Sequence, residues 1–256
     1  MSRYRASLPQ ANGELVITDG GLETDLLFHD GFDLPLFAAF PLVADAAGRE
    51  ALRRYYDRYA DIARANGVGF ILESPTWRAN PDWAPQLGYT LAQLDDMNHA
   101  AIALMADIRD RHDSATSPIV VSGCVGPRGD GYVVGTTMSS EDAQEYHSRQ
   151  VGVFAESAAD MVTAITMTYA EEAVGVVRAA AVLPRDPGRQ RMARRRRHPP
   201  VDHRRRGPPR HANRRPAERP VACQWRAADR PRGCVRRSDR GRCGGRDRRQ
   251  QRGPLQ

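Results

Sequence analysis

The amino-acid composition of the chain changes abruptly near residue 182. Residues 181–256 contain 25 Arg and no Lys, and only six residues that are Leu, Ile, Val or Phe. A segment with so few apolar side chains cannot bury enough surface to offset the conformational entropy that folding costs. The sequence therefore predicts a folded part, residues 1–182, and a disordered Arg-, Pro- and Gly-rich tail without a core, residues 183–256.

The net charge of +7 averages two unlike parts. Residues 1–180 carry 13 Arg and 25 acidic residues, whereas the rest of the chain carries 25 Arg and six acidic residues. A tail with this much positive charge suggests binding to nucleic acid or to another anionic surface. Against this, Trp225 is its only aromatic residue, so the stacking surfaces of single-strand binders are missing. If the tail does bind nucleic acid, the affinity of the protein for polynucleotides must fall steeply with salt concentration and must vanish when residues 183–256 are deleted.

The composition of the tail has a second explanation at the level of the gene. Arg, Pro, Gly and Ala are encoded by codons rich in G and C, and the absence of Lys from the whole chain indicates a GC-rich gene. Such a gene, translated one base out of register, would produce a segment of this kind. We favour out-of-frame translation over a nucleic-acid-binding arm.

The spacing of the cysteines indicates whether the chain has a metal site or disulfides, and the apolar runs indicate its cellular compartment. Cys124 is the only Cys of the folded part, and the spacing of Cys223, Cys234 and Cys243 matches neither a structural zinc site nor a disulfide framework. No signal-peptide core precedes the folded part, and no apolar run is long enough to span a membrane. We therefore expect a cytoplasmic protein.

Short apolar runs alternate with segments of helical periodicity up to residue 182. We predict strands at residues 14–18, 69–73, 118–122 and 161–166, and helices at residues 50–65, 91–111, 141–158 and 170–181. Four βα units in succession predict an α/β fold with a parallel sheet covered by helices. Four units could be half of a doubly wound sheet or the first half of an eight-stranded barrel. In both cases the chemistry is expected at the carboxyl ends of the strands.

The segments at these strand ends resemble one enzyme family. The matching segments are Asp19-Gly20-Gly21 with Glu23-Thr24, then Thr76-Trp77-Arg78-Ala79-Asn80, then Gly123-Cys124-Val125-Gly126-Pro127, and Tyr146-His147. In this order and at these places in the βα units, they are similar to the signatures of the homocysteine S-methyltransferase family. The resemblance covers about residues 14–181. It implies the first four βα units of a (β/α)₈ TIM-type barrel and transfer of a methyl group to the thiol of homocysteine, giving methionine.

The same resemblance implies a zinc ion that ionises the thiol. In the family the zinc is held by three cysteines, one after strand six and an adjacent pair after strand eight. All three positions would fall beyond residue 182, and the sequence contains no Cys-Cys pair. We therefore expect no metal ligands in this chain and a truncated or frameshifted, inactive form of the enzyme.

The resemblance also implies a substrate site at the mouth of the barrel. The candidate substrate-binding residues are Asp19, Gly20, Gly21, Glu23, Thr76, Trp77 and Thr166. Asp19 would pair with the ammonium group of the substrate, although an Asp here could instead stabilise the following turn. The family usually has a Glu after strand four, where this chain offers Thr166 and Thr168. The exact thiol or selenol acceptor and the methyl donor therefore stay open.

Four further side chains and the sheet edges have simpler interpretations. By spacing, Glu171 and Glu172 belong to the first turn of a helix. His147, on a helix beside Tyr146, is expected to be structural, and Cys124, just after a strand, a small apolar filler. Four units of a barrel would leave two strand edges unpaired, which predicts self-association. A half-barrel that dimerises into a complete barrel is a competing possibility.

Overall fold

The structure, a computed structural model, describes residues 1–182, which form an α/β fold with four parallel strands and five α-helices. The strands are β1 (Val16–Thr18), β2 (Gly69–Glu73), β3 (Ile119–Val125) and β4 (Met161–Ala164). The α-helices are α1 (Leu22–Phe28), α2 (Ala46–Asn66), α3 (Leu91–His112), α4 (Ser140–Ala155) and α5 (Ala170–Val182). Short 3₁₀ helices occupy Pro9–Asn12, Pro35–Phe37, Phe40–Ala44 and Pro85–Leu87. The predictions made for the tail, residues 183–256, lie outside the described residues.

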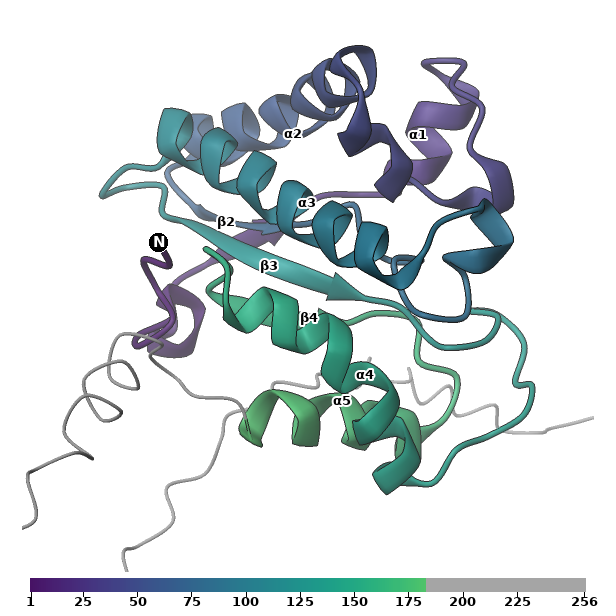
Figure 1. Cartoon of the computed structure of the whole chain (residues 1–256). Coiled ribbons are helices and arrows are strands. Elements are labelled where there is room, and N and C mark those ends of the chain that lie inside the picture. The colour runs from purple at the N-terminus through teal and green to yellow at the C-terminus, as the bar shows by residue number, and fades with distance from the viewer. Residues whose placement is uncertain (183–256) are drawn as a thin grey trace, which may run out of the picture. The chain divides into compact units, whose positions relative to one another are not determined.

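The four strands follow the order of the chain, β1-β2-β3-β4, and each neighbouring pair is parallel. Successive helices from α2 to α5 contact one another, and they cover one face of the sheet (Figure 1). Alternate strand residues such as Phe70, Leu72, Ile119 and Val121 join the helices in the main core. The intervening residues face the opposite side of the sheet, because side chains alternate along a strand. The predicted parallel α/β fold is confirmed, whereas the complete eight-stranded barrel stays a prediction.

Strand β3 continues further than the sequence predicted. We expected it to end at residue 122 with a turn at Gly123, but it runs to Val125, so Cys124 lies within the strand. A Cβ on Gly123 would stand 2.4 Å from the ring of Phe154 in α4. Here glycine allows a helix to approach the strand closely instead of ending it.

The helices begin where local capping directs them. Ser139 caps α4, and Thr90 with Gln93 forms a capping box at the start of α3. Asp45 accepts a hydrogen bond from the Gly48 N–H, so α2 begins four residues before the predicted start. The apolar periodicity that predicted this helix is weak in its first turn, which explains the difference. The short helix α1 was not predicted.

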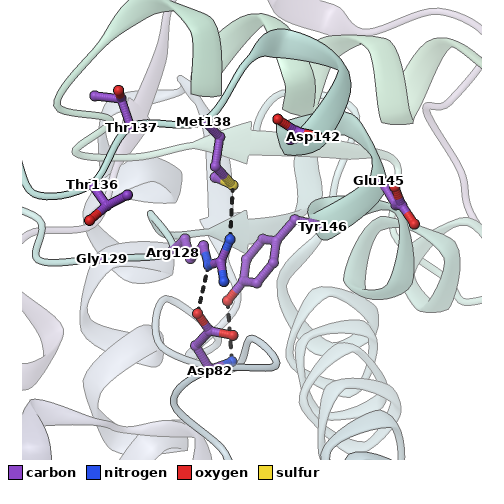
Figure 2. Close-up of a pocket in the computed structure, with 9 residues that line it drawn as sticks. All are labelled: Asp82, Arg128, Gly129, Thr136, Thr137, Met138, Asp142, Glu145 and Tyr146. Carbon is purple, nitrogen blue, oxygen red and sulfur yellow. Dashed lines mark hydrogen bonds and ion pairs between the residues drawn. The ribbon is translucent and has the colours of Figure 1, made fainter.

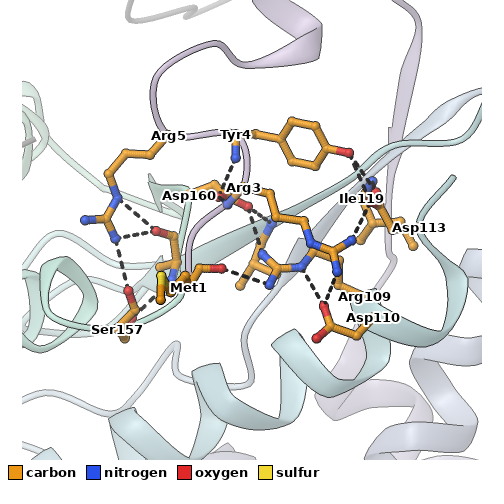
Figure 3. Close-up of polar contacts among 12 residues, drawn as sticks. Met1, Arg3, Tyr4, Arg5, Arg109, Asp110, Asp113, Ile119, Ser157 and Asp160 are labelled. Atoms are coloured by element: carbon orange, nitrogen blue, oxygen red, sulfur yellow. Dashed lines mark hydrogen bonds and ion pairs between the residues drawn. The ribbon is translucent and has the colours of Figure 1, made fainter. Parts of the chain in front are cut away.

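The segment before β1 is attached to the amino-terminal end of the sheet by a buried polar cluster (Figure 3). Asp160, which precedes β4, accepts hydrogen bonds from the backbone N–H groups of Arg3 at 2.6 Å, Tyr4 at 2.8 Å and Val121 at 3.0 Å. The buried guanidinium of Arg109 lies 3.5 Å from the same carboxylate. This one carboxylate thus ties the first residues of the chain to α3, β3 and β4.

Among the described residues, no helix combines the length and the apolar character needed to cross a bilayer.

Candidate functional site

The carboxyl ends of the four strands meet at one edge of the sheet, because all four strands are parallel. Asp19 follows β1 directly, and Glu73 is the last residue of β2. Strand β3 ends at Val125, and Thr166 stands two residues beyond the end of β4. In α/β proteins this edge is the usual place for ligands. We refer to Asp19 and Glu73 together as the carboxylate pair.

Asp19 is half-buried and is held in place from helix α2. The Tyr55 hydroxyl donates a hydrogen bond of 3.1 Å to Asp19 Oδ2. Burial, together with the negative charge of Glu73, raises the pKa of Asp19 to about 7. A Cβ on the neighbouring Gly20 would stand 2.7 Å from the Tyr59 hydroxyl, so a larger residue at position 20 would require the Tyr59 side chain of α2 to move. Asp19 is therefore oriented by α2 and carries a proton part of the time at neutral pH.

Glu73 is a buried carboxyl group that the sequence-based site prediction missed. Its exposed fraction is 8%, and its Oε2 atom has no hydrogen-bond partner. Burial raises the pKa of Glu73 to about 7, although hydrogen bonds from Thr163 and Ser122 act in the opposite direction. The signal in the sequence was an acidic residue closing an apolar strand just before a polar loop. That pattern predicts where the strand ends, but it does not by itself predict that Glu73 belongs to a site.

Glu23 and Arg78 form a second charged group at the same edge. Glu23 lies in α1 and is half-buried; burial raises its pKa, and the positive charge of Arg78 partly offsets the effect. The Arg78 guanidinium carbon lies 4.4 Å from the ring centre of Trp77 and 3.8 Å from that of Trp83. Burial lowers the pKa of Arg78, while the charges of Asp130 and Glu23 support its cationic form. The positive charge of Arg78 thus interacts with the carboxylates of Glu23 and Asp130 and with two indole rings.

Trp77 connects the loops that follow β2, β3 and β4. Its indole N–H donates a hydrogen bond of 2.9 Å to Thr166 Oγ1. A Cβ on Gly126 would stand 2.1 Å from the Trp77 carbonyl oxygen, and one on Gly131 would stand 2.6 Å from the indole ring. Thr166 has a φ of 58°, a left-handed conformation that is rare for a β-branched residue. These contacts fix the loops relative to one another, and little of the Trp77 ring remains exposed.

Thr76 is fully buried, and its hydroxyl is used inside the protein. Thr76 Oγ1 donates to the carbonyl oxygen of Cys124 at 2.7 Å and lies 2.7 Å from Ser74 Oγ. These bonds join the loop after β2 to strand β3. The structure therefore places Thr76 beneath the edge that a ligand would reach.

A buried hydrogen-bonded pair, His147 and Glu172, fixes the loop between β3 and α4. His147 Nε2 lies 3.0 Å from Glu172 Oε1, and the backbone N–H of Arg128 donates to the same oxygen at 2.7 Å. Burial works to raise the pKa of Glu172, but the hydrogen bonds from His147 and Arg128 outweigh it and lower the pKa. The structural role expected for His147 fits this geometry. Glu172 is in the first turn of α5, as predicted, but it is buried.

An open pocket of about 830 Å³ lies between this loop and α4 (Figure 2). Arg128 crosses it, with its Nε 2.6 Å from Asp82 Oδ2 and its guanidinium over the ring of Tyr146. The Tyr146 hydroxyl donates to Asn80 Oδ1 at 2.7 Å. None of the predicted site residues lines this pocket, and its cation is already paired. We therefore assign the candidate site to the strand ends.

The structure brings some of the predicted residues together and separates others. Asp19, Gly20 and Gly21 form the connection from β1 to α1, and Glu23 lies in the first turn of α1. Trp77 and Thr166 bond to each other, whereas Thr76 lies apart in the interior. Gly20 and Gly21 are exposed, so their backbone is open to a ligand beside Asp19. The substrate-binding roles of all seven residues stay predictions.

The described residues do not fit a zinc site. No three His, Cys, Asp or Glu side chains within residues 1–182 lie close enough together to hold a metal ion. Cys124 is buried, and burial, together with the charges of nearby carboxylates such as Glu73, raises the pKa of its thiol. A zinc ligand must be a thiolate, which a raised pKa disfavours. Cys223, Cys234 and Cys243 lie outside the described residues.

Comparison with known proteins identifies the family. The chain belongs to the homocysteine S-methyltransferase family, whose model matches residues 16–190. Two solved structures have a similar fold, both of the homocysteine methyltransferase MmuM from Escherichia coli. The oxidized form has a TM-score of 0.58 and 18% identity over 72% of this chain and 63% of that chain, and the metallated form has a TM-score of 0.56 and 17% identity over 70% and 63%.

At these identities the likeness to MmuM is one of fold. The chain spans about 63% of the length of the two MmuM structures. A search of curated proteins found no match to the sequence.

Proposed function

We propose that residues 14–181 bind homocysteine, or a similar thiol or selenol amino acid, at the carboxyl ends of the strands. In this proposal the four βα units correspond to the first half of a (β/α)₈ barrel. Asp19 accepts hydrogen bonds from the ammonium group of the substrate, and the exposed backbone of Gly20 and Gly21 lies beside it. The observation that carries the proposal is that Asp19 is oriented by Tyr55, is partly exposed to solvent and has no cationic partner among the described residues.

We propose further that this chain alone does not transfer the methyl group. A thiol attacks as its thiolate, and zinc, when bound, would supply the ionised thiol. The described residues do not contain a donor set for that ion. The chain would then keep amino-acid recognition and lack the group that activates the thiol.

Calorimetry with the full chain tests the binding step. L-Homocysteine is titrated into the wild type, into Asp19→Asn, and into the control Asp96→Asn, which removes a carboxylate from the exposed surface of α3. A hydrogen bond to a charged group contributes about 1.5–3 kcal/mol, so Asp19→Asn should weaken binding about tenfold or more. The control should bind as the wild type does. Failure of the wild type to bind L-homocysteine would refute the proposed ligand.

A separate assay tests the proposed inactivity. The full chain is supplied with zinc, L-homocysteine and a panel of methyl donors, and methionine is measured together with the zinc content of the protein. We expect no methionine above the background without protein. Stoichiometric zinc and repeated turnover would show that ligands outside the described residues complete the site.

A further inference from the structure

We propose that Glu73 is the second carboxylate of the amino-acid site, and that Glu73 and Asp19 together bind the protonated amino group of the ligand. The inference rests on the proposed function, from which it takes the class of ligand. The inference adds Glu73, a residue that no sequence motif indicated. The amino group would then be bound by residues from the ends of two neighbouring strands, β1 and β2.

The two carboxyl groups come from the same end of the sheet, where the charge of Glu73 acts on Asp19. Strands β1 and β2 are paired with Thr18 beside Ile71, so Asp19 and Glu73 come from the same edge of adjacent strands. Leu72 belongs to the core under the helices, and Glu73 therefore faces the opposite side of the sheet. There its hydroxyl neighbours are Ser122 and Thr163, whose own oxygens are 2.8 Å apart.

The interior of the protein leaves Glu73 incompletely satisfied. Its Oε2 atom is buried without a hydrogen-bond partner, and no ion pair among residues 1–182 includes Glu73 or Asp19. The cation of Arg78, in the loop after β2, interacts with Glu23 and Asp130. Two neighbouring carboxyl groups with no cation between them cannot both ionise without cost, so they take up either protons or a cationic ligand.

A protonated amine suits this pair better than a metal ion does. The described residues place no third His, Cys, Asp or Glu with the pair, whereas zinc sites in proteins have three or four protein ligands and Ca²⁺ takes about six to eight oxygens. An ammonium group carries one positive charge and three hydrogen-bond donors. It can donate to Asp19 and to the unpartnered Oε2 of Glu73 at the same time.

The test compares L-homocysteine with 4-sulfanylbutanoate, which has the same thiol and carboxylate but lacks the amino group. Both are titrated calorimetrically into the full chain as wild type, Glu73→Gln and Glu73→Asp, with Glu50→Gln on the exposed surface of α2 as the matched control. The wild type and the control should prefer L-homocysteine by tenfold or more. Glu73→Gln should lose most of that preference without losing affinity for 4-sulfanylbutanoate, and Glu73→Asp, which keeps the charge, should retain part of it.

Thermal unfolding without ligand separates this role from a structural one. Glu73→Gln removes a buried, unpartnered charge, so its melting temperature should equal or exceed that of the wild type while its amine preference falls. A structural role would instead lower the melting temperature and leave the preference unchanged, which would overturn the inference and leave the proposed function standing. If the wild type binds neither compound, the proposed function and this inference both fail. If it binds both equally, the thiol ligand stands and the inference about the amino group is refuted.

Discussion

Two carboxyl groups at the strand ends hold protons near neutral pH because of where the chain places them. Burial raises the pKa of both groups, and the charge of Glu73 further disfavours ionisation of the partly buried Asp19. Ionisable groups with strongly shifted pKa values are more common at functional sites than elsewhere in proteins. Neither residue type predicts such a shift by itself, since an Asp or Glu on an open surface ionises near pH 4.

We expect the unliganded protein to lose stability as the pH rises from about 5 to 7. Both groups have higher pKa values in the folded state than in the unfolded chain, so the folded state binds more protons across this range and its free energy of unfolding falls. For Glu73, a shift from 4.5 to about 7 corresponds to roughly 3 kcal/mol. Urea unfolding at several pH values measures the slope.

The variants Glu73→Gln and Asp19→Asn show which groups cause the change in the free energy of unfolding with pH. Each removes one titrating carboxyl, so each should flatten the decline between pH 5 and 7, and the double variant should flatten it further. A slope that is the same in all variants would mean that other groups cause the pH dependence. The surface variant Glu50→Gln should keep the slope of the wild type.

At the scale of elements, the strands and helices follow from local patterns, and their exact ends follow from contacts. Helix α3 begins within the capping box that Thr90 makes with Gln93, a feature written in neighbouring residues. Strand β3 runs past Gly123 because the ring of Phe154 occupies the space of a side chain there. That contact joins residues 31 positions apart, so no local pattern could reveal it.

The attachment of the amino-terminal segment gives a prediction at this scale. Asp160→Asn should destabilise the protein by about 3 kcal/mol, because the change removes the buried negative charge beside the Arg109 guanidinium, leaving it the exposed Asp110 as anionic partner, and weakens the bonds to two N–H groups of the first residues. Urea unfolding measures the loss. Asp110→Asn, which removes an exposed carboxylate of the same cluster, should cost less than about 1 kcal/mol.

Equal effects of these two substitutions would contradict the central position of Asp160. Limited proteolysis adds a local readout, since Asp160→Asn should expose the segment before β1 to cleavage sooner than the rest of the described part.

At the scale of the whole molecule, the described sheet has two strands with one unpaired edge each. Within residues 1–182, β1 pairs only with β2, and β4 pairs only with β3. Unpaired strand edges offer rows of free N–H and C=O groups to other chains. How residues 183–256 bear on these edges is outside the described part of the chain.

Self-association of the full chain is the corresponding prediction. Sedimentation velocity should show species heavier than the 28.4 kDa chain, increasing with concentration. Thr18→Lys places a charge on the exposed edge residue of β1 and should reduce the heavier species, whereas Thr136→Lys, in the exposed loop before α4, should not. A single sharp dimer would favour the half-barrel that completes itself by pairing, and a monodisperse monomer would refute self-association.

By itself the sequence determined the four βα units, their order and the polar segments that end at one edge, because apolar periodicity, caps and turn residues are local properties of the chain. The family resemblance over those segments was confirmed by the family match to residues 16–190. Only the tertiary structure decided that the charge of Glu73 acts on Asp19, that Thr76 is internal and that Trp77 bonds to Thr166. Burial and charge proximity depend on which strands pair and in which register, and those are contacts between residues far apart in the chain.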